Sequence, residues 1–359
     1  MEIQTRERID IKFMKASSPL PLKRVWQIES FLLKIFEYGD YSFRSTLSGS
    51  LSSRLQSTLF VAQKGNKILA AAGSLYSLDN PTVAILGPVC VAPEYRRKGL
   101  ATELCSLLLA HTEAQGTKAV YLGIKPDNPA VHLYSKLGFD KHTGVVMRKL
   151  FCSEQQLLER YSPKKTNARR MGWQDFASVS ALLCEPADIY SFDFNRGIFS
   201  AKYIEPDRFL SVFPKMMKSF EKNGGFANIL ETVDDLSIVG IAQISLLAST
   251  IQSHMAVLDF FVLDNFLDRA CNLVRDTIRS HFITSHGRVV SIKNGDFQDY
   301  KVGSKRLAAG SSKRLVSYCL ACDTKKKQIL RLLGAKQYSV LSGYVNLNGE
   351  LIDVLIFEL

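Results

Sequence analysis

Apolar runs separated by short polar turns divide the first 151 residues into strands and helices. A strand near 9–14 is expected to precede two helical segments, 25–36 and 51–55. A hairpin should follow, because the runs 58–62 and 68–76 flank Lys64-Gly65-Asn66, whose residue types tolerate positive φ. The later runs predict a buried strand at 86–91, a helix at 100–110, a strand at 119–124, a helix at 130–137 and a last strand at 144–151.

A similar order of elements follows the polar stretch 153–166, which we interpret as a linker. The elements predicted there are a strand at 168–171, a helix at 175–183, a helical insert to 220, a hairpin of 227–232 and 236–246, a strand at 254–262, a helix at 270–282, a strand at 289–293 and a closing strand at 351–357. Strands broken by crossover helices predict a mixed sheet with a parallel pair, hence the α/β class. We therefore predict two domains, 1–152 and 167–359.

Length and composition agree with two packed domains. The chain has 359 residues, of which 46% are hydrophobic and 22% charged. No run approaches the roughly 18 apolar residues that a membrane span needs. Residues 1–8 mix charges and contain no apolar signal segment, so we expect a cytoplasmic protein without a membrane span.

The cysteines and the net charge limit the kinds of site and partner that the chain can have. Seven scattered cysteines argue against a disulfide framework, and Cys319-x-x-Cys322 lacks a second pair at zinc spacing, so no metal site is expected. The net charge of +12 suits nucleic acid, an anionic membrane or a polyanionic cofactor. The basic residues are dispersed apart from the run 325–327 and the near-duplicates 304–307 and 312–315. We interpret the near-duplicates as a mobile basic loop with a solvated face rather than a nucleic-acid arm.

The segment from Val89 to Thr102 carries the clearest chemistry. A strand leads through a turn at Pro93 and a basic loop into an apolar helix. A helix N-terminus presents free N–H groups and a positive dipole end, Gly99 lets the backbone approach a ligand closely, and Arg96, Arg97 and Lys98 add charge suited to a pyrophosphate. A solvated basic turn is the alternative for this segment alone.

The same segment resembles the acetyl-coenzyme A signature of the GNAT superfamily of N-acetyltransferases, Arg/Gln-x-x-Gly-x-Gly/Ala after a central strand. Arg96-Arg97-Lys98-Gly99-Leu100-Ala101 fits that signature without a gap, whereas a dinucleotide fingerprint needs more glycines. The resemblance implies a mixed, mostly antiparallel sheet with helices on both faces. It also implies that acetyl-CoA contacts Val89, Cys90, Val91, Arg96, Arg97, Lys98, Gly99, Leu100, Ala101 and Thr102, the strand groups polarising the thioester carbonyl.

A second motif follows at residues 119–139: a strand, Asn128, a helix with Tyr134, and Gly138-Phe139. GNAT proteins resemble this order, which implies that Asn128 contacts the coenzyme and that Tyr134 is the general acid for the leaving thiolate. A phenol with a pKa near 10 can protonate a thiolate. The alternative is that Tyr134 only packs on its helix face. Gly87-Pro88 is consistent with a bulge in the preceding strand.

The general base stays unassigned. Residues 82–90 contain no carboxylate, and Glu94 is expected in the turn, pointing at solvent. A water chain, or an acceptor that is already neutral, could serve instead. Cys90 could in principle form an acyl-enzyme, but a strand cysteine is usually a small buried hydrophobe, so direct transfer is favoured.

The second half resembles a degenerate copy of the first. If Val262 takes the place of Val91, a loop at 267–272 puts Ala270 at the Gly99 position and Asp268 where phosphates would lie. Leu330 then matches Tyr134 and offers no acid. This half is not expected to hold acetyl-CoA; it would shape the acceptor site or the oligomer.

Together, these features predict an N-acetyltransferase that moves acetyl from acetyl-CoA to a primary amine by direct attack in a ternary complex. The acceptor, a protein N-terminus, a lysine or a small amine, stays open, as do the acyl-chain length and a homo-oligomeric state. The alternative function is a non-catalytic acetyl-CoA sensor or scaffold. A third, nucleic-acid binding, would give steep salt dependence.

Overall fold

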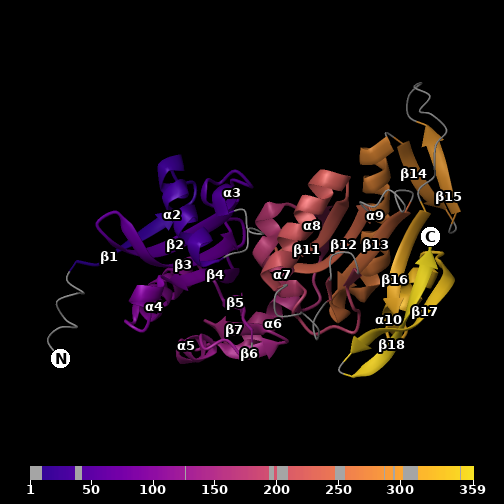
Figure 1. The fold of residues 1–359 in the computed structure, drawn as a ribbon. Coiled ribbons are helices and arrows are strands. Elements are labelled where there is room, and N and C mark those ends of the chain that lie inside the picture. The colour runs from indigo at the N-terminus through magenta and orange to yellow at the C-terminus, as the bar shows by residue number, and fades with distance from the viewer. Residues whose placement is uncertain are drawn as a thin grey trace. The chain divides into compact units, whose positions relative to one another are not determined.

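The chain folds into two compact units, one built mainly from residues 1–158 and the other from most of the remainder (Figure 1). The structure is a computed structural model, and it describes residues 10–36, 43–125, 127–193, 198–199, 209–246, 255–286, 288–293, 296–301, 314–347 and 349–359. Segments Gly172–Ala181 and Pro206–Pro214 also belong to the first unit by their contacts. The boundary at 153–166 stays a prediction, and each unit is considered by itself.

The first unit contains a seven-stranded sheet in the order β1-β2-β3-β4-β5-β7-β6. Only β4 and β5 are parallel, and every other neighbouring pair is antiparallel. The strands are β1 (Lys12–Ser17), β2 (Leu55–Lys64), β3 (Lys67–Ser77), β4 (Val83–Val91), β5 (Ala119–Gly123), β6 (Asp140–Thr143) and β7 (Val146–Leu150). This arrangement confirms the predicted mixed sheet and the β2–β3 hairpin.

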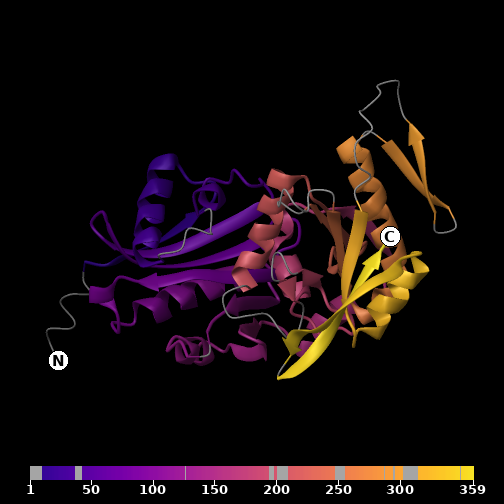
Figure 2. The same ribbon diagram turned by 45° about the vertical axis from the view of Figure 1, so that its right-hand side comes forward.

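Helices cover both faces of this sheet (Figure 2). They are α2 (Leu22–Ile35), α3 (Phe43–Leu47), α4 (Leu100–Ala114) and α5 (Val131–Lys136). The 3-10 helix Pro93–Tyr95 and α6 (Glu154–Leu158) also belong to the first unit, whereas the 3-10 helix Glu159–Tyr161 belongs to the second. The alternation of β3 separates two cores: Ala71 faces α2 and α3, whereas Ala70 and Ala72 face α4 and α5. The prediction of a helix at 51–55 is wrong, because Leu55 already pairs with Ser77 in the sheet and the helix lies earlier, at α3.

Strands β4 and β5 pair over three residues only and then separate. Val83–Ile85 pairs with Ala119–Tyr121, and beyond this point β4 continues without a β5 partner. On its other side β4 carries the predicted bulge: Gly87 and Pro88 together oppose Gly73 of β3. A Cβ on Gly73 would lie 3.1 Å from the Gly87 carbonyl oxygen, so a glycine is needed there. The gap beside β4 therefore opens toward both faces of the sheet.

The second unit contains a sheet with the same topology. Its order, β8-β11-β12-β13-β16-β18-β17, matches that of the first sheet strand for strand, and its single parallel pair, β13–β16, corresponds to β4–β5. The strands are β8 (Thr166–Arg170), β11 (Phe226–Thr232), β12 (Ile238–Leu246), β13 (Met255–Val262), β16 (Arg314–Leu320), β17 (Lys336–Leu347) and β18 (Glu350–Glu358).

The remaining elements correct part of the sequence reading. They are α7 (Phe176–Leu182), α8 (Phe209–Asn223), α9 (Leu267–His286), α10 (Thr324–Leu332), 3-10 helices at Trp173–Asp175 and Asp264–Phe266, and the short strands β9 (Phe192–Asp193), β10 (Ile198–Phe199), β14 (Arg288–Lys293) and β15 (Asp296–Lys301). The predicted strand at 289–293 is confirmed as β14, which among the described residues pairs with β15 in a two-stranded sheet. Arg314 and Leu315 begin β16, so they do not belong to a basic loop, and 302–313 lie outside the described residues.

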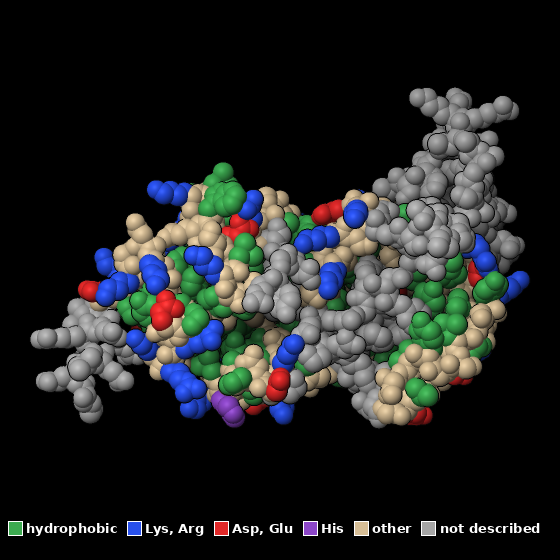
Figure 3. Space-filling model, in the orientation of Figure 1, with side chains coloured by type: hydrophobic (Ala, Val, Ile, Leu, Met, Phe, Trp, Pro, Cys, Tyr) green, Lys and Arg blue, Asp and Glu red, His purple; other side chains and the backbone are tan. Residues whose placement is uncertain are grey.

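Three general features accompany the fold. Among the described residues, no helix is long and apolar enough to cross a membrane. All seven cysteines are free thiols. On the face of the first unit visible in Figure 3, Lys and Arg side chains are spread among other residues without forming one continuous band, as the dispersed basic residues of the sequence indicate.

Candidate active site

One cavity in the first unit brings together nearly all the predicted site residues. Its volume is about 1040 Å³, and it passes through the gap beside β4. Its lining includes the predicted residues Val89, Cys90, Val91, Arg96, Arg97, Gly99, Leu100, Ala101, Thr102, Asn128 and Tyr134. Two motifs that are separate in sequence thus meet in one hollow, because β4 and β5 are neighbours and each leads into its own helix.

The N-terminus of α4 opens onto this cavity. Gly99 stands at the helix N-cap with φ 82°, a conformation that side chains with a Cβ rarely adopt, and it provides no side-chain cap. Arg97 also has a positive φ, of 59°. The first N–H groups of the helix and the exposed Arg96 and Arg97 therefore face the same hollow. This is a site suited to a phosphorylated ligand.

Lys98 lies outside the cavity lining. Its ammonium group is 5.3 Å from the ring centroid of Tyr95. On the same ring, Lys67 lies at 5.5 Å and forms a 3.0 Å ion pair with Glu94. Glu94 thus has a lysine partner on the surface, and the pKa of its carboxyl is lowered by its own backbone N–H and by Lys67.

Tyr134 lies on α5 and is 8% exposed, with its ring edge-on to Phe139 at 5.8 Å. Burial raises the pKa of Tyr134 well above its usual value, and the neighbouring Cys105 and Cys90 thiols raise it further. The phenol therefore keeps its proton at any ordinary pH. A group in this state can donate a hydrogen bond or a proton into the cavity.

Asn128 has a structural task as well as a place in the lining. Its side-chain oxygen accepts a 2.9 Å hydrogen bond from the N–H of Ala130, which fixes the turn that leads into α5. The oxygen is therefore occupied, and the side-chain NH₂ is the group suited to meet a ligand carbonyl.

Neither a nucleophile nor a carboxylate base stands out among the described residues of the lining. Burial raises the pKa of Cys90 to about 12, outweighing a backbone hydrogen bond and the charge of Arg96, so the thiol is not ionised. Asp, Glu and His do not occur in that lining. This agrees with the absence of a carboxylate on the central strand.

The structure adds an apolar part of the cavity that the sequence reasoning missed. It is lined by Leu32, Ile35, Phe36, Phe43, Leu47 and Leu59, from α2, α3 and β2. The apolar segment at the end of α2 was visible in the sequence, but α3 was misplaced, so its contribution could not be recognised.

The second unit has no counterpart of the basic loop. After β4, four residues separate the 3-10 helix Pro93–Tyr95 from α4, whereas α9 begins directly after the 3-10 helix Asp264–Phe266. The predicted loop at 267–272 is therefore wrong: these residues form the first turns of α9. Leu330 does occupy the Tyr134 position, because the N–H of Ala335 bonds to its carbonyl oxygen as the N–H of Phe139 bonds to that of Tyr134.

A buried ion pair lies at the point where β13 stops pairing with β16 in the second sheet. The ammonium of Lys326 on α10 lies 2.6 Å from a carboxylate oxygen of Asp259 on β13, and the two side chains are 0% and 1% exposed. Lys326 also donates to the carbonyl of Tyr190, and Asp259 accepts from Ser191. Asp259 lies just beyond the last residue of β13 that pairs with β16.

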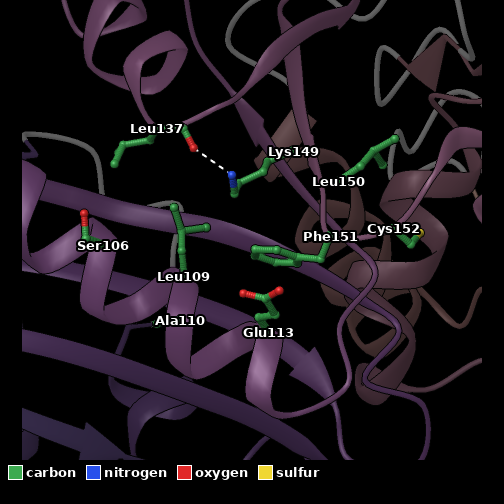
Figure 4. Close-up of a pocket in the computed structure, with 9 residues that line it drawn as sticks. All are labelled: Ser106, Leu109, Ala110, Glu113, Leu137, Lys149, Leu150, Phe151 and Cys152. Atoms are coloured by element: carbon green, nitrogen blue, oxygen red, sulfur yellow. Dashed lines mark hydrogen bonds between the residues drawn. The ribbon is translucent and has the colours of Figure 1, made fainter.

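A second hollow of about 560 Å³ lies on the other side of α4 (Figure 4). The ammonium of Lys149 donates to the Leu137 carbonyl oxygen at 2.9 Å and lies over the Phe151 ring. Glu113 approaches the hollow from α4. The lysine here secures the end of α5, and this hollow contains none of the predicted site residues.

Comparison with known families agrees with this geometry. The model of the acetyltransferase (GNAT) family matches residues 23–139, so the first unit contains a GNAT acetyltransferase domain. A comparison with curated proteins found no match. The match includes both motifs that meet in the cavity.

Solved structures give weaker likenesses. A ribosomal-protein-S5-alanine acetyltransferase from Vibrio fischeri is 12% identical with a TM-score of 0.38, covering 54% of this chain and 92% of its own. A GNAT-family acetyltransferase from Streptococcus pneumoniae is 15% identical with a TM-score of 0.37, covering 54% and 99%. A spermidine/spermine N-acetyltransferase from Vibrio cholerae is 13% identical with a TM-score of 0.36, covering 54% and 92%. Likenesses this weak say nothing about the acceptor.

Proposed function

We propose that the first unit transfers the acetyl group of acetyl-CoA to a primary amine by direct attack in a ternary complex. The observation that supports this most is the single cavity that joins the α4 N-terminus, Asn128 and Tyr134. The cavity lies in the domain that the GNAT family model matches. The un-ionised thiol of Cys90 favours direct transfer over an acyl-enzyme.

Acetyl-CoA supplies the activated acetyl thioester, and the chain supplies binding and proton transfer. The N–H groups at the start of α4, with Arg96 and Arg97, would hold the phosphates. The unpaired part of β4 and the Asn128 NH₂ would hold the pantetheine arm. Tyr134, kept protonated by burial, would donate its proton to the departing sulfur.

The Tyr134→Phe variant tests this assignment. We expect kcat for thiol release from acetyl-CoA to fall about 100-fold, the lower end of the range for a general acid, while the Kd for CoA stays unchanged. Tyr121→Phe is the matched control, because it removes the same atom from a tyrosine buried in β5 outside the cavity. A wild-type kcat in the Tyr134→Phe variant would contradict the assignment of Tyr134 as the general acid.

The missing carboxylate favours one second candidate, a non-catalytic acetyl-CoA sensor. Its signature would be tight CoA binding with no thiol release against any amine. The second unit would then be the output of the sensor.

A further inference from the structure

The cavity has two chemically different ends. One end carries its charged side chains, Arg96, Arg97 and Lys125. The other end, which we call the apolar lobe, is lined by Leu32, Ile35, Phe36, Phe43, Leu47 and Leu59. Thr46 and Ser57 add hydroxyls to this lobe, which lies on the α2 and α3 face of the sheet. A polyanionic coenzyme suits the first end, and the lobe is left for the other substrate.

The described lining residues of the lobe offer no counter-charge to a cation. Every charged side chain among the described lining residues is basic, and none of those residues is Asp or Glu. An ammonium group moved from water into such a lobe would lose its hydration without gaining a counter-charge, which is costly. An alkyl or aryl group would instead gain from leaving water.

We propose that the acceptor is a primary amine carried on an apolar alkyl or aryl body that occupies this lobe. The inference rests on the proposed acetyl transfer and names the substrate class of the same site. It also accounts for the missing base: desolvation disfavours the charged form of an amine and lowers its pKa, so the nitrogen arrives with a free lone pair.

The chemical step balances without a carboxylate. The neutral nitrogen forms a bond to the acetyl carbonyl carbon, and the carbon–sulfur bond breaks. The sulfur receives a proton from the Tyr134 hydroxyl, and the nitrogen gives up one of its protons, which returns to the tyrosine oxygen directly or through water. The products are the N-acetyl amine and the free thiol of CoA.

The first experiment measures thiol release from acetyl-CoA with four acceptors: 2-phenylethylamine, hexylamine, spermidine and a lysine peptide. We expect kcat/KM to be at least tenfold higher for the two apolar amines. Higher kcat/KM for spermidine or the peptide would overturn the inference and leave the proposed acetyl transfer standing. A preference for octanoyl-CoA over acetyl-CoA with a polar amine would also overturn it, because the acyl chain would then fill the lobe.

Binding gives a readout that does not need turnover. Titration calorimetry of 2-phenylethylamine into the CoA-loaded protein should show saturable binding, and spermidine should show none. If CoA binds and phenylethylamine binds but no amine is acetylated, the proposed function fails while the lobe assignment stands. Absent amine binding together with active acetylation of spermidine would remove the lobe assignment alone.

Two neighbouring positions on α3 give a matched pair of variants. Thr46 lines the cavity and Ser45 does not. Thr46→Glu adds a carboxylate to the lobe, so the kcat/KM ratio of spermidine to phenylethylamine should rise at least tenfold. Ser45→Glu adds the same charge to the same helix and should leave that ratio unchanged. The same spermidine-to-phenylethylamine ratio in Thr46→Glu and Ser45→Glu would contradict the inference. If either variant fails to fold, the calorimetric titration of the unmodified protein still tests the inference.

Discussion

The buried pair of Lys326 and Asp259 allows a sharp test of the energetics of the second unit. Lys326→Met keeps most of the length of the side chain and removes its charge. The carboxylate of Asp259, 1% exposed, then loses its ammonium partner while Ser191 and a 3.5 Å contact from Gln243 stay, and the Tyr190 carbonyl loses the Lys326 donor. Removing one partner of a buried pair leaves an uncompensated charge and costs about 3–5 kcal/mol.

The adjacent residue provides the control. Lys325 pairs with Asp188 at 2.5 Å, but the two side chains are 37% and 65% exposed, so Lys325→Met should cost far less than Lys326→Met. A double variant, Lys326→Met with Asp259→Leu, removes both charges and should recover most of the loss, because an apolar pair can replace a buried ion pair.

Urea unfolding followed by circular dichroism, fitted with a separate transition for each unit, measures these free energies. CoA affinity should not change in Lys326→Met, since this residue does not line the cavity of the first unit. The reasoning fails if Lys326→Met costs no more than Lys325→Met, or if the double variant is less stable than the single one.

Three further predictions concern the backbone and pH. Gly99→Val should weaken CoA binding about 5- to 30-fold in calorimetry, because φ 82° costs a side chain of this kind about 1–2 kcal/mol; unchanged affinity would contradict this. The Gly73→Ala variant should lower the Tm by several degrees in a thermal scan, because its Cβ would lie 3.1 Å from the Gly87 carbonyl oxygen and the Pro88 ring. Equal Tm values for the variant and the wild type would show that the bulge shifts to accommodate the methyl group. Burial acts to raise the pKa of Asp235, but hydrogen bonds from Lys164, Thr232 and Ser237 outweigh it and lower that pKa to about 2. The Lys164–Asp235 pair therefore stabilises the fold above pH 3.8 and loses this effect as the pH falls toward 2. The Asp235→Asn variant should lower the free energy of unfolding by about 1 kcal/mol at pH 6, after allowance for solvent screening, and by less at pH 3. A loss of stability that is the same at both pH values would refute this.

The parts of the fold that could be predicted from the sequence are those fixed by local signals. The β2–β3 turn contains Gly65 at φ 57°, and the loop before α4 contains Gly99 at φ 82°. The bulge at Gly87-Pro88 was also predictable, because glycine and proline both weaken a strand locally. Each of these features is decided within a few residues of the chain.

The errors occur where distant residues decide the structure. Arg314 begins β16 because its guanidinium bonds to Glu358 on the neighbouring strand at 2.5–2.6 Å and stacks on Tyr338. Nothing near Arg314 in the sequence announces those partners. The helix expected at 51–55 fails for the same reason, because pairing with Ser77 extends β2 back to Leu55.

The candidate site was predictable where its motifs are continuous in sequence. The α4 loop and the α5 segment each identified their own residues, but their meeting in one cavity depends on the pairing of β4 with β5. The apolar lobe was missed because its lining comes from α2, α3 and β2, whose apolar residues are not distinguishable locally from core residues.

The second unit differs from the first at three places that would hold the coenzyme. It lacks the four-residue loop between the 3-10 helix and α9. It lacks the bulge as well, since β12 and β13 pair without a shift and Gln243 stands opposite Asp259 where Gly73 faces the bulge. Its gap beside β13 holds the buried ammonium of Lys326.

These differences act independently, which has a consequence for any attempt to restore binding. Inserting a basic glycine loop before α9 would supply a phosphate site, but Lys326 and Asp259 would still fill the space for the pantetheine arm. Removing the Lys326–Asp259 pair alone would open the gap but would supply no phosphate site, because α9 begins directly after the 3-10 helix without a loop. The shared strand order therefore does not by itself predict coenzyme binding, because the residues beside the parallel pair differ between the two sheets.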